Sequence, residues 1–246
     1  MISSSSFYTR KIIDKREQFF KKRKSGKNIS TSYFLECIIN KALEVNPKKI
    51  LDLGTGNGFV IMEVARKLPQ LKNTEFIGVD FSKPMVEKAR KNTKNDSRIT
   101  ILRADNFNLP FPNESINIVT DKNTTNISLP ELYRVLVRGG WFFFKEYGLG
   151  KGIKEIATLF PGRVKTKDPL DYIFELRALG FNYIKFEQFF FVEKKSFEEI
   201  KKILEIAPII KNFSPKKDLH LIKETLFQTG NFTTITSEPF VICAQK

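Results

Sequence analysis

The feature that most constrains the fold is a regular alternation of short apolar runs with helical patterns between residues 49 and 146. Strands are expected at 49–53, 75–79, 99–102, 115–120 and 141–146, and helices near 58–67, 83–92 and 129–137. Strands that alternate with helices form a mostly parallel sheet covered by helices on both faces. The run from Trp141 to Phe144 contains no polar residue, as expected for a strand buried on both sides. The predicted fold class is therefore α/β, a doubly wound Rossmann-like sheet.

The segments after residue 147 extend this predicted sheet. Strands are expected at 182–192 and 240–244, and helices at 168–179, 196–206 and 217–228. The two additional strands bring the predicted sheet to seven strands. Because helical patterns fill the space between them, we expect residues 194–237 to form a helical insertion before the last strand. By analogy with other proteins of this fold class, such an insertion is expected to serve as a lid.

The N-terminal segment is helical and basic. Helical patterns run over residues 10–24 and from about residue 30 to residue 46. We therefore expect two parts, a basic N-terminal helical cap over residues 1–46 and an α/β domain over residues 47–246.

The charge of the chain is strongly positive. Its 42 Lys and Arg residues outnumber its 27 Asp and Glu residues, which gives a formal net charge of +15. The densest basic stretch is Lys21–Lys24, near the N-terminus. A segment of this kind is either a contact surface for nucleic acid or another acidic partner, or the solvated face of a helix.

Residue counts exclude several classes of protein. A single His rules out a His-rich metal site and argues against a His-dependent catalytic triad. We therefore expect no metal site. The two cysteines, Cys37 and Cys243, lie far apart in the sequence and give no disulfide framework. They are expected to be buried structural thiols of a cytoplasmic protein. No apolar run approaches the ~20 residues that span a bilayer, and the first residues lack the apolar region of a secretory signal.

The most informative motif is the glycine-rich loop after the first strand, Leu51-Asp-Leu-Gly-Thr-Gly-Asn-Gly58. In an open parallel sheet such a loop lies at the carboxyl edge of the strands, where ligands bind. A dinucleotide fingerprint would place its third glycine at position 59, which is Phe59 here. Asp52 would also repel a pyrophosphate, whereas a carboxylate suits a ligand with an ammonium group. The pattern therefore disfavours NAD and favours a ligand with an amino acid moiety.

Two further acidic residues follow the next two expected strands. Asp80 ends the second strand, where a carboxylate can accept hydrogen bonds from two ribose hydroxyls. Asp105 follows the third strand and can accept a hydrogen bond from the exocyclic amine of adenine. An ammonium, a ribose and an adenine in this order describe S-adenosyl-L-methionine, whose demethylated product is S-adenosyl-L-homocysteine.

The chain resembles the class I S-adenosylmethionine-dependent methyltransferases, and within them the methyltransferase type 11-like group. That group includes ubiquinone/menaquinone-biosynthesis and other small-molecule enzymes. Four segments carry the resemblance in the order of the family: 51–58, 78–85, 104–119 and 131–140. It covers about residues 47–147 and implies that 47–246 is a class I methyltransferase domain.

The resemblance also implies roles for individual residues. Asp52, Gly54 and Gly56 would surround the methionine end, Asp80 would bind the ribose, and Asp105 and Asn106 would contact adenine. The full set of expected cofactor-binding residues is Asp52, Gly54, Thr55, Gly56, Gly58, Asp80, Phe81, Ser82, Asp105, Asn106 and Phe107.

The acceptor side is less defined by the sequence. The stretch 120–126 lacks the Asp/Asn-Pro-Pro-aromatic motif of nucleic-acid amino-methylating enzymes, and neither cysteine is placed for C5 methylation. In-line transfer from an activated sulfonium needs mainly alignment of the acceptor, and a base only where the acceptor is protonated. Candidates for such a role are Glu146, Tyr147 and Asn123.

Three functions follow, in order of preference. The first is methyl transfer to a small or medium organic acceptor. The second is methylation of RNA (tRNA or rRNA) with the basic N-terminus as a contact surface. The third is a non-catalytic module that binds S-adenosylmethionine.

Overall fold

The structure is a computed structural model that describes residues 9–22, 29–124, 126–148, 150–164, 168–207 and 209–246. The chain forms two compact units. The large unit comprises the described residues of 25–146, 170–187 and 241–246, and the small unit those of 1–24, 147–169 and 188–240.

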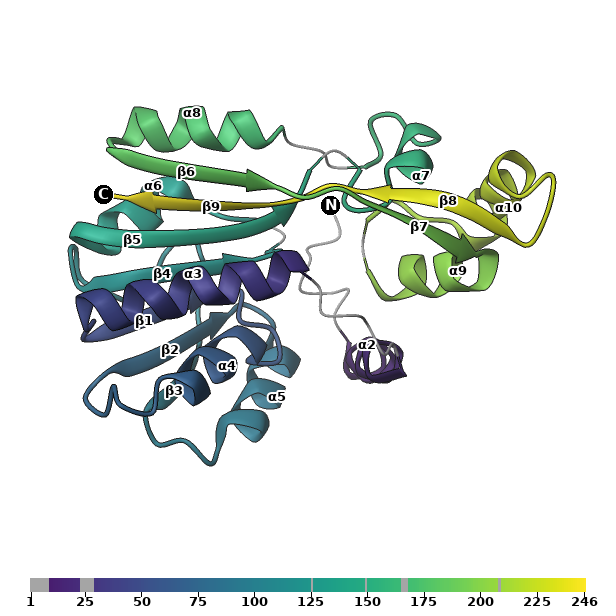
Figure 1. The fold of residues 1–246 in the computed structure, drawn as a ribbon. Coiled ribbons are helices and arrows are strands. Elements are labelled where there is room, and N and C mark those ends of the chain that lie inside the picture. Colours follow the sequence, from purple (N-terminus) through teal and green to yellow (C-terminus); the bar gives the residue numbers. More distant parts are fainter. Residues whose placement is uncertain (1–8, 23–28, 125, 149, 165–167, 208) are drawn as a thin grey trace. The chain divides into compact units, whose positions relative to one another are not determined.

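The large unit is built on a sheet of seven strands in the order β3-β2-β1-β4-β5-β9-β6 (Figure 1). The strands are β1 (Lys49–Leu53), β2 (Glu75–Asp80), β3 (Ile99–Arg103), β4 (Ile116–Lys122), β5 (Leu136–Tyr147), β6 (Tyr183–Gln188) and β9 (Pro239–Gln245). The first five pair in parallel. Hydrogen bonds join Gly139 and Gly140, near the start of β5, to Lys246, beyond the end of β9, so β9 runs antiparallel to β5. This mostly parallel, seven-stranded Rossmann-like sheet confirms the predicted fold class.

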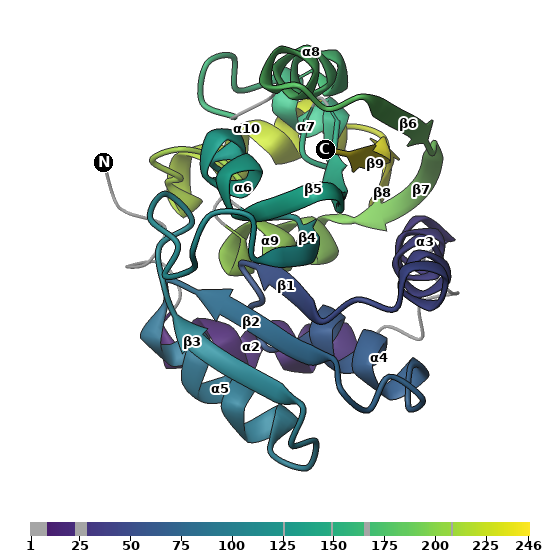
Figure 2. The same ribbon diagram turned by 90° about the vertical axis from the view of Figure 1, so that its left-hand side faces the viewer.

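Helices cover both faces of this sheet. They are α3 (Ile29–Val45), α4 (Phe59–Lys67), α5 (Lys83–Thr93), α6 (Leu129–Val135) and α8 (Pro169–Leu179). Helices α3, α4 and α5 lie on one face, and α6 and α8 lie on the other (Figures 1 and 2). The central strands are buried on both faces, and Phe142, Phe143 and Phe144 of β5 are almost inaccessible. The lack of polar alternation in this run therefore reflects helices on both sides.

Two predicted elements differ from the observed ones. The helix expected at 129–137 ends at Val135, because the chain turns at once into β5, where Leu136 pairs with Ile116. The single strand expected at 182–192 is two strands, β6 and β7 (Phe191–Ser196), which belong to different sheets.

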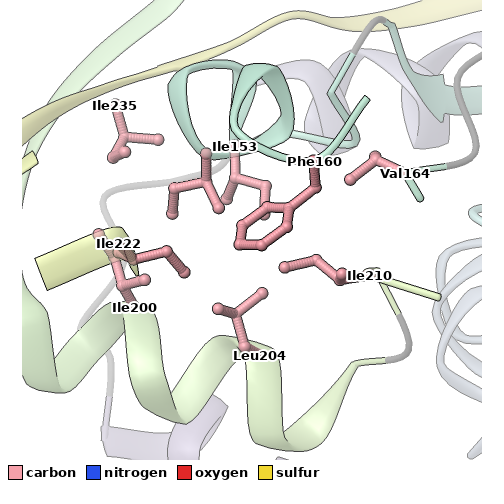
Figure 3. Packing of buried hydrophobic residues seen from close by; sticks show 9 residues of the cluster. Ile153, Phe160, Val164, Ile200, Leu204, Ile210, Ile222 and Ile235 are labelled. Atoms are coloured by element: carbon pink, nitrogen blue, oxygen red, sulfur yellow. The ribbon is translucent and has the colours of Figure 1, made fainter. Parts of the chain in front are cut away.

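The small unit contains a two-stranded antiparallel sheet and four helices. Its elements are α2 (Arg10–Lys22), α7 (Lys154–Thr158), β7, α9 (Phe197–Ile206), α10 (Pro215–Leu226) and β8 (Phe232–Ser237). Its core gathers aliphatic side chains around Phe160, among them Leu204 of α9, Ile222 of α10 and Ile235 of β8 (Figure 3). Ile200 and Leu204 belong to this core, so the helix of the predicted insertion buries its apolar face within the unit.

Sequence patterns indicate only part of the small unit. Helix α7 and strand β8 were not predicted, and the helix expected over 10–24 is described to Lys22. Residues 23 and 24, which belong to the basic Lys21–Lys24 stretch, lie outside the described residues. Within the described parts of the chain, no helix combines the length and apolar character needed to cross a membrane. The lid over 194–237 and the cytoplasmic location stay predictions.

Candidate functional site

The glycine-rich loop between β1 and α4 has a backbone that only glycine adopts readily. Gly54, Gly56 and Gly58 have φ values of +58°, +59° and +83°. A Cβ on Gly54 would collide with the side chain of Thr124, which follows β4. A Cβ on Gly56 would meet no atom closer than 3.9 Å, so the space beside Gly56 is open. The first glycine thus packs against the protein, whereas the second borders free space that a ligand can enter.

Asp80 at the end of β2 holds this loop in place. Its Oδ2 accepts a hydrogen bond from the backbone N–H of Gly56 at 2.9 Å. Its Oδ1 accepts one from the backbone N–H of Ser82 at 2.8 Å. Burial raises the pKa of the carboxyl, and these two hydrogen bonds oppose the shift. Each oxygen keeps a second lone pair with which it can accept a ligand hydroxyl.

Asp52 lies on β1, between β2 and β4, with only 1% of its surface exposed. Its Oδ1 accepts a hydrogen bond from the Thr120 hydroxyl at 2.7 Å, while Oδ2 has no partner. Burial raises the pKa of Asp52 to about 6. A buried carboxylate oxygen without a donor is costly unless a ligand supplies one.

Two hydroxyls near the same edge of the sheet share this property. The Oγ of Ser82 is buried without a hydrogen-bond partner, and the Oγ1 of Thr55 is buried close enough to Asp52 to lower the pKa of its carboxyl but without a well-formed hydrogen bond. Together with the open space at Gly56, these unpaired atoms fit a ligand that has both an ammonium and hydroxyl groups. The residues present therefore fit S-adenosylmethionine.

The residues expected near adenine lie after the neighbouring strand β3. The Oδ1 of Asp105 accepts a hydrogen bond from the backbone N–H of Phe107 at 3.0 Å. The side-chain amide of Asn106 donates to the carbonyl of Asn126 at 3.2 Å. Phe107 is 60% exposed, and Phe81, after β2, is 48% exposed. Two exposed aromatic rings beside carboxylates are consistent with a flat ligand that stacks on them.

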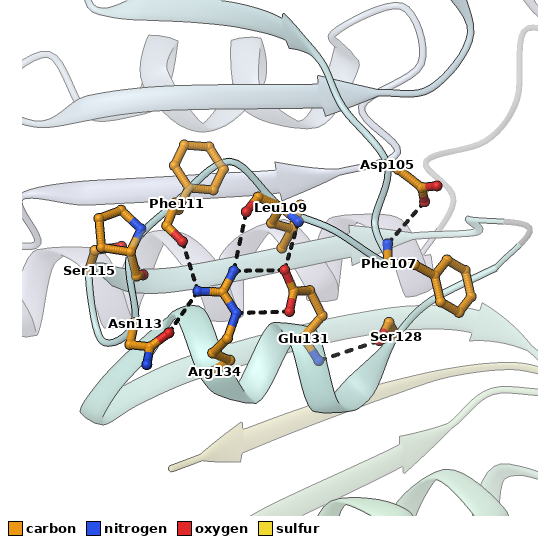
Figure 4. Close-up of polar contacts among 10 residues, drawn as sticks. Asp105, Phe107, Leu109, Phe111, Asn113, Ser115, Ser128, Glu131 and Arg134 are labelled. Atoms are coloured by element: carbon orange, nitrogen blue, oxygen red, sulfur yellow. Dashed lines mark hydrogen bonds and ion pairs between the residues drawn. The ribbon is translucent and has the colours of Figure 1, made fainter.

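A pair of residues on α6 fixes the loop that carries Asp105, and sequence reasoning missed this role (Figure 4). The Arg134 guanidinium forms a bidentate ion pair with Glu131, at 2.7 and 2.8 Å. Arg134 also donates to the carbonyls of Leu109 and Phe111, at 3.2 and 2.8 Å. Glu131 in turn accepts from the backbone N–H of Leu109 at 2.7 Å. Their spacing of three residues on a predicted helix was the sequence signal from which their ion pair could have been predicted.

Charged groups are buried at the ends of β4 and β5, on the acceptor side of the predicted site. Asp121 is fully buried, and burial raises its pKa well above the ordinary value. Glu146, a candidate from the sequence, is 3% exposed. The pKa of the Tyr172 hydroxyl is raised mainly by burial and further by the charges of Glu146 and Asp121. Burial also lowers the pKa of Lys145 to about 7. The edge therefore holds a group of ionisable side chains whose protonation is altered by exclusion from water.

The other two candidates for the acceptor side are placed differently. Asn123 is exposed after β4, and its backbone N–H donates to the Lys145 carbonyl at 2.8 Å. Tyr147 is the last residue of β5 and falls in the small unit. In the large unit, the strand ends bring Asp52, Asp80 and the glycine loop together, and Asp105 follows on the adjacent strand.

Comparison with protein families gives one matching model, that of a methyltransferase domain, over residues 50–140. This match confirms the resemblance predicted from the four sequence segments.

Relatives with known names match part of the chain. The chain is 35% identical over 116 residues to a demethylmenaquinone methyltransferase of Thermus thermophilus, which covers 44% of this chain and 51% of that protein. It is 41% identical over 83 residues to the enzyme of the same name from Thermotoga maritima, covering 34% of each. The chain thus spans about half or less of the length of these relatives.

Solved structures resemble a larger part of the chain. The YcgJ protein from Bacillus subtilis aligns with a TM-score of 0.62 and 20% identity, over 87% of this chain and 98% of that one. The phosphoethanolamine N-methyltransferase 2 of Haemonchus contortus, in complex with phosphomonomethylethanolamine and S-adenosylhomocysteine, aligns with a TM-score of 0.60 and 22% identity, over 100% of this chain and 61% of that one. At these identities, the likeness shows a shared fold.

Proposed function

We propose that this protein transfers a methyl group from S-adenosyl-L-methionine to a small or medium organic acceptor. The observation that carries the proposal is the group of unsatisfied acceptors and open backbone at the carboxyl ends of β1 and β2. There, Asp52 has one unpaired buried oxygen, and Asp80 fixes a glycine loop that borders free space.

Each residue has a distinct task in this proposal. The Asp52 carboxylate pairs with the ammonium of the methionine moiety, and the Gly54–Gly58 loop lets the ligand approach its backbone. Asp80 accepts the ribose hydroxyls, and Asp105 with Asn106 contacts the adenine, beside the ring of Phe107. The bound sulfonium supplies an activated methyl group, so the protein mainly aligns the acceptor with it and excludes water.

Carboxyl groups on the acceptor side can remove a proton where the acceptor atom carries one. Glu146 lies at the end of β5, and Asp121, at the end of the neighbouring strand β4, is buried beside it. The charge of Glu146 adds to the effect of burial, which contributes most, in raising the pKa of Asp121. We assign to Glu146 the removal of a proton from the acceptor.

The names of two relatives support a class of acceptor. Both are named for demethylmenaquinone, a small-molecule acceptor. This supports the small-molecule assignment, and neither of these names supports the alternative of RNA.

The test combines cofactor binding with a search for the acceptor. The full chain is first titrated with S-adenosylhomocysteine by calorimetry. It is then incubated with methyl-tritiated S-adenosylmethionine and a cell extract, and the products are separated by size and by sensitivity to RNase. We expect binding, and label in the small-molecule or lipid fraction. RNase-sensitive label at high mass would replace the proposal with an RNA methyltransferase, and binding without label in any fraction would favour the non-catalytic module.

The same assay tests the role of Glu146. Replacement of Glu146 with Gln should lower kcat and leave the affinity for S-adenosylhomocysteine unchanged. An unaltered kcat over the whole pH range would remove Glu146 from the mechanism.

A further inference from the structure

One charged group of the proposed ligand still needs a partner, the carboxylate of the methionine moiety. In the proposed site, Asp52 takes the ammonium, Asp80 the ribose, and Asp105 with Asn106 the adenine. The methionine moiety is a zwitterion at neutral pH, with its carboxylate on the same carbon atom as its ammonium. A cation that binds this carboxylate must therefore lie close to Asp52.

Lys122, the last residue of β4, lies on the face of the sheet to which Asp52 points. In the register of β1 and β4, Asp52 pairs with Thr120, whose hydroxyl donates to the Asp52 carboxylate at 2.7 Å. Side chains two residues apart on a strand point to the same face and are separated by about 7 Å along it. Lys122 therefore follows Thr120 toward the carboxyl ends of the strands. Burial raises the pKa of Asp52, and the positive charge of Lys122 acts in the opposite direction.

The ammonium of Lys122 also lies near the end of the glycine loop. Its Nζ is 5.6 Å from the centre of the Phe59 ring, and Phe59 is the first residue of α4, directly after Gly58. The N-terminus of a helix carries a partial positive charge, and the first turn of α4 contains no acidic residue that would neutralise it. The glycine loop thus has a carboxylate, Asp52, before it and positive charge after it.

A ligand can reach the space between these charges. Lys122 is half-buried, and Phe59 is 39% exposed. The space beside Gly56, between them and Asp52 along the chain, is open, because a Cβ there would meet no atom closer than 3.9 Å. The unpaired Oδ2 of Asp52 independently indicates that a charged ligand group belongs at this end of the site.

We propose that Lys122 binds the carboxylate of the methionine moiety, so that Asp52 and Lys122 together select a ligand with a zwitterionic amino acid end. This inference rests on the proposed function, because it adds a contact to the same cofactor. The two side chains distinguish an amino acid from a simple amine. For an amine without a carboxylate, Lys122 contributes only repulsion.

The experiment compares three ligands by calorimetry on the full chain. S-adenosylhomocysteine carries both charged groups, S-adenosyl-3-thiopropylamine lacks the carboxylate, and 5′-methylthioadenosine lacks both groups. The wild type should bind S-adenosylhomocysteine at least about tenfold more tightly than the thiopropylamine, because the latter loses a charge-assisted hydrogen bond.

Lys122→Met removes the charge and keeps the apolar stem of the side chain. Its affinity for S-adenosylhomocysteine should fall at least about tenfold. Its affinity for the thiopropylamine should stay the same or rise, because a repulsive charge is gone, and its affinity for methylthioadenosine should not change. Damage to the fold would weaken all three ligands, so this pattern is specific to a carboxylate contact. Lys122→Arg keeps the charge and should retain the preference for S-adenosylhomocysteine.

Lys49→Met is the matched control. Lys49 begins β1, at the amino ends of the parallel strands, and pairs with Glu75 at 3.4 Å. This variant loses the same charge from the chain and should keep the preference of the wild type. A loss of preference equal to that of Lys122→Met would show an effect of net charge and overturn the inference.

Two further results would overturn this inference and leave the proposed cofactor in place. One is equal affinity of the wild type for S-adenosylhomocysteine and the thiopropylamine, which is read without any variant. The other is an unchanged preference in Lys122→Met. If the wild type binds none of the three ligands, the proposed cofactor is itself wrong, and the role of Lys122 is rejected with it.

Discussion

The carboxylate of Asp80 accepts a hydrogen bond from the backbone N–H of Gly56 at 2.9 Å, which ties the end of β2 to the loop after β1. The second oxygen of Asp80 accepts from the backbone N–H of Ser82 at 2.8 Å, where α5 begins. One acidic side chain therefore fixes the two segments between which the proposed ligand would lie. The residue assigned to the ribose also builds the site that receives it.

This dual role predicts two effects of Asp80→Asn. The amide can accept only one of the two backbone hydrogen bonds, so the free energy of unfolding should fall by about 1–3 kcal/mol. The affinity for S-adenosylhomocysteine should fall at least about tenfold, because the ribose loses a charged acceptor. Denaturant unfolding and calorimetry measure the two effects.

Asp96→Asn is the matched control for this variant. Asp96 also accepts a backbone hydrogen bond, from the N–H of Arg98 at 3.1 Å. It lies before β3, however, at the amino ends of the parallel strands and away from the carboxyl ends where Asp80 lies. This variant should lose stability and keep its affinity. If Asp80→Asn binds as tightly as the wild type, the ribose assignment is wrong.

Three of the glycines with positive φ, Gly54, Gly56 and Gly162, allow steric effects to be separated from binding. Gly162→Ala, at a φ of +71° with no atom within 4 Å, should cost only the backbone strain, about 1–2 kcal/mol. Gly56→Ala should cost a similar amount of stability and also weaken cofactor binding, because its Cβ would enter the open space. Gly54→Ala should be the least stable, because its Cβ meets Thr124 as well. Equal affinity of Gly56→Ala and Gly162→Ala would contradict the placement of the ligand.

The sequence predicts the large sheet well because its signals are local. The strand that ends in Asp52-Leu53 and the glycines that follow it are set by the residues themselves, since burial on both faces demands apolar runs and positive φ demands glycine. The same holds for Asp80, whose position at a strand end needs no tertiary information.

The break between β6 and β7 could not be predicted in this way. Phe189, Phe190 and Phe191 form an unbroken apolar run without a turn residue. The division arises because Phe189 bonds to Pro239 at the start of β9, whereas Phe191 pairs with Ser237 of β8. Such pairings join residues about 50 positions apart, and no local pattern records them.

The contacts of Arg134 predict that its replacement lowers the stability of the fold and increases local opening of the loop around Asp105. Arg134→Met keeps the apolar stem of the side chain and removes its hydrogen bonds to Leu109, Phe111 and Glu131. The free energy of unfolding should fall by about 2–4 kcal/mol, because Glu131 and two carbonyls lose a charged donor. Hydrogen exchange should also show faster exchange of the amides of Phe107 and Leu109.

Arg138→Met provides the comparison for this variant. Arg138 is 89% exposed at the side chain and pairs with Glu114 at 3.3 Å, so its loss should cost less than about 1 kcal/mol. A similar loss of stability in both variants would show that the Glu131–Arg134 pair does not hold the loop.

The raised pKa of Asp52 predicts opposite pH dependences for stability and for binding. Its pKa is about 6 in the folded chain and about 4 when unfolded. Between these values the unfolded chain has released a proton that the folded chain retains, so the contribution of Asp52 to stability falls as the pH rises. Cofactor binding needs the ionised carboxylate to pair with the ammonium, so affinity should rise over the same window. We expect the Kd for S-adenosylhomocysteine to be roughly tenfold higher at pH 5 than at pH 7.

Two variants test whether Asp52 is the source of this pH dependence of the Kd. Asp52→Asn cannot ionise, so it should bind weakly at both pH values, with a ratio of the two Kd values near one. Asp121→Asn removes another buried carboxylate from the same edge of the sheet and should keep the ratio of the wild type. Calorimetry at pH 5 and pH 7 in buffers of equal ionic strength measures all three proteins. If the ratio persists in Asp52→Asn and vanishes in Asp121→Asn, the ammonium pairs with Asp121, and the ligand lies closer to β4 than the proposed site allows.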